Sequence, residues 1–158
     1  MVRNVGAGLC LTLVALLVCG APLCARTTEP FPGNGWAQIT DLTPVDGGTM
    51  ISYTISGWGD PIGLFEGSGQ FLLDPDGNIL DGQSTLEGLL GDQVFLAFEG
   101  ILDGDGNITA SVTIVGGRGT YEDATGHGDL QGQLVEATFA ATWDGTIRYG
   151  AAQQHTDN

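Results

Sequence analysis

A glycine-rich corner limits what this chain can fold into more than any other feature of its sequence. Gly116, Gly117 and Gly119 fall within four residues, between two segments of alternating apolar and polar residues. Glycine adopts positive φ without a Cβ clash, so this spacing predicts a sharp turn between two strands. Tyr121 follows the turn. An aromatic ring at this point packs most simply as a plug against the end of a closed sheet.

Short alternating segments recur along the chain, with turn residues between them, and helical periodicity is almost absent. Eight antiparallel strands can close into a barrel, and closure removes the exposed edges that promote aggregation. We therefore expect an all-β fold, an eight-stranded antiparallel β-barrel, with a two-sheet sandwich as the rival that periodicity also permits. The expected strands are Trp36–Leu42, Thr49–Trp58, Ile62–Leu73, Ile79–Leu89, Gln93–Leu102, Ile108–Val115, His127–Leu134 and Ala137–Arg148.

The N-terminus has the three parts of a secretory signal peptide: Arg3, the apolar run Leu9–Val18, and the small-residue exit Cys19–Ala25. The apolar run is too short to span a bilayer comfortably. A lipoprotein anchor requires a small residue just before the modified cysteine, whereas Val18 precedes Cys19 and Leu23 precedes Cys24, so such an anchor is disfavoured. A secreted or periplasmic location follows. The expected parts are a signal peptide at 1–25, a linker at 26–34, a barrel domain at 35–149 and a disordered tail at 150–158.

Composition excludes several classes of function. The formal net charge is −15, which repels nucleic acid and anionic lipid. All three cysteines lie in the leader, at Cys10, Cys19 and Cys24, so thiolate chemistry and disulfides are not expected in the mature domain. His127 is the one histidine inside the expected barrel, which argues against a histidine-rich zinc site. No cofactor and no transmembrane segment are expected.

The corner also carries a resemblance. Gly116-Gly117-Arg118-Gly119-Thr120-Tyr121-Glu122, followed by Gly126, resembles the signature of the allene oxide cyclase barrel. Plant dirigent proteins have a similar corner, and small secreted bacterial proteins of no known activity match best, through Ala124-Thr125-Gly126. The resemblance implies an eight-stranded, calycin-like barrel with an apolar interior. It transfers no catalytic residue, because Gly35–Asp41 lacks the Glu and Asn of the plant cyclases' first strand.

Three residues are candidates for acid–base catalysis. Glu66 and Glu99 are the possible carboxylate pair, and His127 is a possible general base near Asp129. Strand alternation favours an outward, solvated position for both glutamates, because the apolar residues of their strands occupy the other face. No partner for His127 is identifiable, and a solvated strand-end position is its alternative.

Aromatic residues on the apolar faces of the strands are the candidates for a ligand cavity, and their alternative role is to fill the core. They are Tyr53, Phe65, Phe71, Phe98, Phe139 and Trp143.

Two Asp-x-Asp-Gly-Asn loops invite a calcium hypothesis through Asp74, Asp76, Asp103 and Asp105. The same residues are typical of hairpin turns, which is the interpretation we favour. Asn107 begins a glycosylation sequon.

The sequence therefore favours a secreted, noncatalytic barrel: an interaction domain or a carrier of a small hydrophobic molecule. The alternative is a cyclase or isomerase that folds a flexible apolar substrate inside the barrel, where shape and exclusion of water supply the catalysis. A surface protein without any ligand is the third possibility. Oligomeric state stays open.

Overall fold

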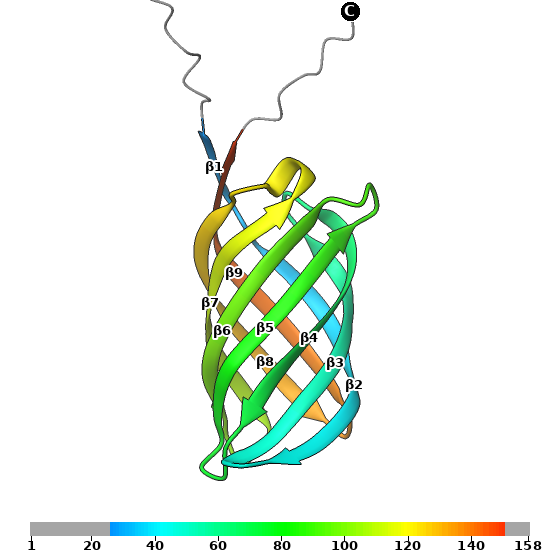
Figure 1. Ribbon diagram of the computed structural model, residues 1–158, viewed down its shortest axis with the longest axis vertical. Helices are drawn as coiled ribbons and strands as arrows, with labels where there is room; N and C mark the ends of the chain where they lie inside the picture. Colours follow the sequence, from blue (N-terminus) through cyan, green and yellow to red (C-terminus); the bar gives the residue numbers. More distant parts are fainter. Residues whose placement is uncertain (1–25, 151–158) are drawn as a thin grey trace, which may run out of the picture.

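The computed structural model describes residues 26–150, which form one closed antiparallel barrel (Figure 1). Each strand pairs with the next along the chain, and β9 returns to pair with β2. This closure confirms the barrel and excludes the two-sheet sandwich. The predicted signal peptide and residues 151–158 lie outside the described part. The strands are β1 (Arg26–Pro30), β2 (Gly33–Val45), β3 (Gly48–Gly59), β4 (Gly63–Leu73), β5 (Asn78–Gly88), β6 (Gln93–Leu102), β7 (Asn107–Arg118), β8 (Thr125–Val135) and β9 (Thr138–Gly150).

The first barrel strand is interrupted, which accounts for an additional strand beyond the eight expected. β1 and β2 pair in succession with the same edge of β9. Pro32 lies in the break between them and has no N–H to give to the ladder. The N–H of Phe31 still donates to the Gly145 carbonyl at 2.8 Å. Residues 26–30 therefore extend the barrel wall, whereas the sequence predicted a linker through residue 34.

The remaining strands run close to their predicted bounds. β6 has the predicted ends, whereas β7 continues three residues past Val115, because Gly116, Gly117 and Arg118 stay paired with β6. A register shift between Phe95 and Leu96 absorbs the additional residue on β7. The glycine corner is therefore still part of the barrel wall. None of the helical structure in residues 26–150 has the length and apolar character that a bilayer crossing requires.

The corner uses its glycines for two different reasons. Gly119 has φ +67°, and a Cβ there would lie against the Asp92 carboxylate. Gly117 instead permits a close approach, because a Cβ would lie 2.2 Å from the Gln93 carbonyl oxygen. The turn then forms the short 3-10 helix η1 (Gly119–Tyr121), and the Asp92 carboxylate accepts from the Thr120 N–H at 3.0 Å. This holds Tyr121 buried at the barrel end where β1 begins and β9 ends (Figure 1).

The barrel interior contains two apolar clusters, one toward each end. The cluster near η1 includes Tyr121 and Trp143, and the opposite one includes Tyr53 and Phe71. Ile55 and Leu130 pack against both. Alternation along each strand sends apolar side chains inward and polar ones to solvent, as in β7, where every second residue from Ile108 to Ile114 is buried.

Candidate binding interior

An apolar cavity of about 80 Å³ lies inside the barrel, and its walls draw on both clusters. Five of the six aromatic residues named from the sequence line it. The sixth, Phe65, packs instead against Trp143, with ring centroids 5.7 Å apart. The five that line it are Tyr53, Phe71, Phe98, Phe139 and Trp143.

Small residues from three strands explain why space remains on one side of the interior. Ala141 of β9 faces inward and pairs with Gly35 of β2 on one side and Gly132 of β8 on the other. Three consecutive cross-strand positions therefore carry at most one methyl group. A Cβ at Gly35 would be 3.2 Å from the Ile55 side chain, so Ile55 occupies part of the space that these residues leave.

The cavity contains few polar groups. Among the non-aromatic residues of the described part, Ser84 is the one buried polar or charged residue, and its hydroxyl donates to the Ser68 carbonyl at 3.3 Å. It also hydrogen-bonds to the Tyr53 phenol. Burial raises the pKa of Tyr53 to about 12, and the hydrogen bond to Ser84 opposes part of that rise. Tyr53 therefore stays protonated at neutral pH and acts there as a hydrogen-bonding group, not as a base.

Trp143 has an unsatisfied donor. Its side chain is 8% exposed, and its Nε1–H has no hydrogen-bond partner within residues 26–150. The indole packs against the rings of Phe31 and Phe65, with no polar side chain among these contacts. A buried donor left unpaired costs about 1–3 kcal/mol. Nε1 is on the edge of the indole that lies against Gly33 of β2, where an added Cβ would be 2.9 Å from it.

Aromatic side chains pack against one another near both ends of the barrel. Near η1, Tyr121 meets Tyr149 edge to face, with centroids 5.2 Å apart, and the Tyr149 hydroxyl donates to Glu29 at 2.7 Å. At the other end, Phe71 contacts Phe98 and Phe139 at centroid distances of 6.0 Å.

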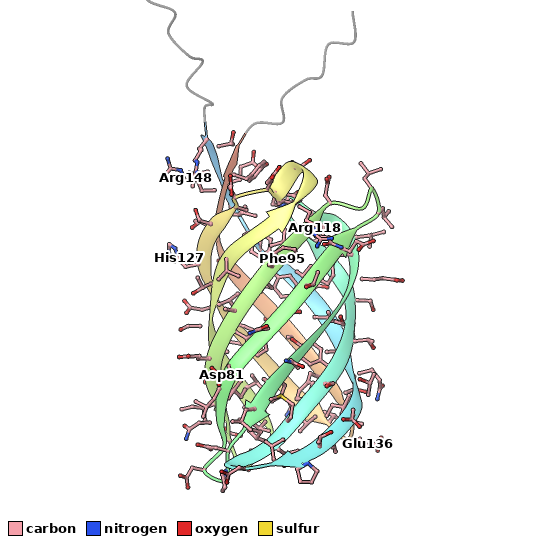
Figure 2. All side chains as sticks on the ribbon, viewed as in Figure 1. Asp81, Phe95, Arg118, His127, Glu136 and Arg148 are labelled. Carbon is pink, nitrogen blue, oxygen red and sulfur yellow. The ribbon has the colours of Figure 1, made fainter. Side chains whose placement is uncertain are left out.

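The three acid–base candidates lie on the outside of the barrel. Glu66, Glu99 and His127 are exposed and come from β4, β6 and β8. His127 projects away from the wall in Figure 2, between Thr113 and Thr146 on the neighbouring strands. The structure brings none of the three together, and none lines the cavity. Among residues 26–150, no carboxylate or imidazole lines the cavity.

The aspartate loops are hairpin turns closed by their own side chains. Asp74 Oδ1 accepts from the backbone N–H groups of Asp76 at 2.9 Å and Asn78 at 2.7 Å. The Asn78 side-chain amide donates to Asp74 Oδ2 at 2.8 Å. These hydrogen bonds, led by that of the Asn78 amide, hold the pKa of Asp74 below its usual value.

The second loop repeats this arrangement with Asp103 as the acceptor for Asp105 and Asn107, and its pKa is lowered in the same way. Within residues 26–150, no three His, Cys, Asp or Glu residues are grouped to hold a metal ion. The loop geometry accounts for these carboxylates as turn acceptors.

Sequence reasoning missed Phe31, which fell in the predicted linker, and it also missed Ser84 and Ala141 as cavity residues. Both share the phase of inward residues on their own strands: Ser84 lies two positions before the buried Leu86, and Ala141 two before Trp143. That alternation was a usable signal for each. Neither small residue stands out among the many serines, alanines and glycines of this chain without knowledge of its cross-strand neighbours.

No family model matches this sequence, and no curated protein does either. Among solved structures, the chain is similar to the pterocarpan synthase dirigent protein GePTS1, with a TM-score of 0.61. The match covers 89% of this chain and 99% of that one at 12% sequence identity. The two proteins share a barrel fold, as the sequence resemblance implied. At this level of identity the likeness concerns the fold alone, because one fold can carry many functions.

Proposed function

We propose that this protein is a secreted, noncatalytic binding barrel that takes a small, largely apolar molecule with a hydrogen-bond acceptor into its interior. The observation that supports this most is the unpaired Nε1–H of Trp143, whose indole lines the apolar cavity and lies with its Nε1 edge against Gly33. Buried donors are almost always satisfied in native proteins, and an unpaired one calls for an explanation. An acceptor on a bound molecule supplies one once the indole turns its N–H from Gly33 toward the cavity.

The size of the cavity limits the ligand. At about 80 Å³ it is roughly half the volume of an engineered 150 Å³ cavity that binds benzene. It is also well below the 300 Å³ or more that is typical of pockets for larger ligands. A short branched chain or one small ring is therefore the upper limit for an occupant, and a ring requires the interior to expand. Leu96 and Phe98 line the cavity and are half-buried, so they are the side chains whose movement would enlarge it.

The absence of proton-transfer groups from the interior supports a noncatalytic role. Within residues 26–150, the polar side chains that line the cavity are Tyr53, Ser84 and Trp143. The signal peptide predicted at residues 1–25 supports secretion. The negative charge of the chain keeps it soluble and away from anionic surfaces.

A cyclase or isomerase is the second candidate, and Tyr53 with Ser84 is the observation that favours it. A protonated phenol in an apolar cavity can donate to an oxygen on which negative charge develops. Such an enzyme would fold its substrate mainly by shape. Tyr53→Phe would then abolish turnover of an apolar epoxide, while a carrier would lose no more than part of its affinity.

Thermal-shift measurements with benzene and benzaldehyde test the proposal, because these probes share a ring and differ in a carbonyl acceptor. We expect benzaldehyde to stabilise the wild-type protein more than benzene at equal concentration. Trp143→Phe removes the N–H and should abolish that difference. Equal stabilisation of the wild type by both probes, or by neither, would contradict the proposed role of Trp143.

A further inference from the structure

Two tryptophans are exposed on the outer wall of the barrel. Trp36 of β2 is 64% exposed and Trp58 of β3 is 42% exposed. Trp36 pairs with Ser56, and Trp58 pairs with Asn34, so the two tryptophans occupy diagonal positions on adjacent strands. Such positions are about 7–8 Å apart, which places both indoles in one surface patch. Neither side chain contributes to either core cluster.

A hollow of about 480 Å³ adjoins Trp36 on its other side, over β8, β9 and β2. Trp36 and Gln133 pair with Ala140 from opposite sides. Ala140 therefore forms a low floor on β9, with the indole as one wall and the Gln133 side chain as the other. Two strand spacings separate the walls by about 10 Å at the backbone, a width that accepts a flat six-membered ring.

The polar groups around this hollow are uncharged. The next row of outward residues consists of Asn34, Thr142 and Gln131, which are paired across the same three strands. The side-chain hydrogen bonds found in residues 26–150 involve none of these three, nor Gln133. The side-chain amides of Asn34, Gln131 and Gln133 and the hydroxyl of Thr142 thus present both donors and acceptors to solvent. No ionisable side chain lines the hollow, although the chain has a net charge of −15.

From this arrangement we propose that the outer face of β8, β9 and β2 binds a neutral oligosaccharide. A pyranose ring has an apolar C–H face and an edge of hydroxyl groups. Its face fits against the Trp36 indole, and its hydroxyls can exchange hydrogen bonds with Asn34, Gln133 and Thr142. Trp58 extends the aromatic surface toward a second sugar. An anionic partner is disfavoured by the charge of the rest of the barrel.

Calorimetric titration and affinity electrophoresis test this site, with neutral hexasaccharides of β-glucan, α-glucan, xylan and mannan as probes and an oligogalacturonate as the anionic comparison. We expect binding of at least one neutral probe and none of the anionic one. Trp36→Ala should weaken binding about tenfold or more, and Trp36→Phe should retain part of it. Ala140→Val should also weaken binding, because it raises the floor of the hollow without removing a polar group.

Phe95→Ala is the matched control, since Phe95 is an outward, half-buried aromatic on β6, across the barrel from this face (Figure 2). It should bind the sugar as the wild type does. Unchanged thermal unfolding of Trp36→Ala, measured alongside, separates lost binding from lost folding. The proposal is overturned if no neutral probe binds, or if Trp36→Ala binds as tightly as the wild type. A dimer in sedimentation that Trp36→Ala dissociates would assign this face to a second copy of the chain instead.

Discussion

Filling the cavity from Ala141 should stabilise the barrel, and the structure sets the size of the effect. Ala141→Val adds two carbon atoms on the inward face of β9, between the small neighbours Gly35 and Gly132. Each buried carbon contributes about 0.8 kcal/mol, or about 1.6 kcal/mol for two. A cavity of 80 Å³ costs about 1.9 kcal/mol at ~24 cal/mol per Å³, which is the upper limit of the gain. We expect an increase of about 1–1.5 kcal/mol in the free energy of unfolding.

The control is the neighbouring residue. Ala140→Val makes the same chemical change on the outward face of the same strand, so any gain from the β-propensity of valine appears in both variants. Its own effect should stay within about 0.5 kcal/mol, as for most surface substitutions. The difference between the two variants therefore isolates the contribution of the cavity.

Urea unfolding followed by circular dichroism and tryptophan fluorescence measures both free energies, and the two probes together check for a two-state transition. A gain of this size corresponds to a rise of about 3–6 °C in Tm. If Ala141→Val is less stable than Ala140→Val by 1 kcal/mol or more, the interior is already filled. Overpacking would then outweigh burial, and the binding-interior argument would fail.

Three further perturbations test other parts of the structure. Gly119→Ala should destabilise the barrel by about 1–2 kcal/mol in urea unfolding, because φ is positive at this position and the new Cβ displaces the Asp92 carboxylate. An unchanged unfolding midpoint would show that the corner has another conformation. The pKa of Asp103 is lowered by its hydrogen bonds, first from the Asn107 side chain, so its stabilising contribution is complete above its ordinary pKa of 3.8 and is lost as the pH falls below that value. The unfolding free energies of wild type and Asp103→Ala should therefore differ at neutral pH and converge in strong acid, and a constant difference would contradict this origin. Burial raises the pKa of all three tyrosines, Tyr53 to about 12, so their contribution to stability is complete below pH 10 and is lost as the pH rises above it. Ultraviolet titration should show phenolate appearing above pH 10 together with unfolding, and ionisation at pH 10 in the folded protein would refute the burial.

The alternation of apolar and polar residues within each segment was enough to predict most strands of the barrel wall. Alternation in β9 placed Phe139, Trp143 and Ile147 inside, and the structure buries all three. The glycine corner was readable because its requirements come from residues close in sequence. Residues 26–30 were not readable as a strand, because their partner is the end of β9, more than a hundred residues away, and the nearby prolines are typical of a linker.

The candidate sites also depended partly on local sequence pattern and partly on the tertiary structure. Sequence alone determined which aromatic side chains of the eight expected strands face inward, because a period of two depends on each strand by itself. It did not identify Phe31, which fell in the predicted linker and is buried beside the cavity. Only the tertiary structure decided that Gly35, Ala141 and Gly132 lie side by side beside a cavity and that Trp143 lacks a partner there. It also decided which uncharged side chains surround Trp36. These features depend on register between strands far apart in the chain, and register is fixed by closure of the whole barrel, not by any one segment.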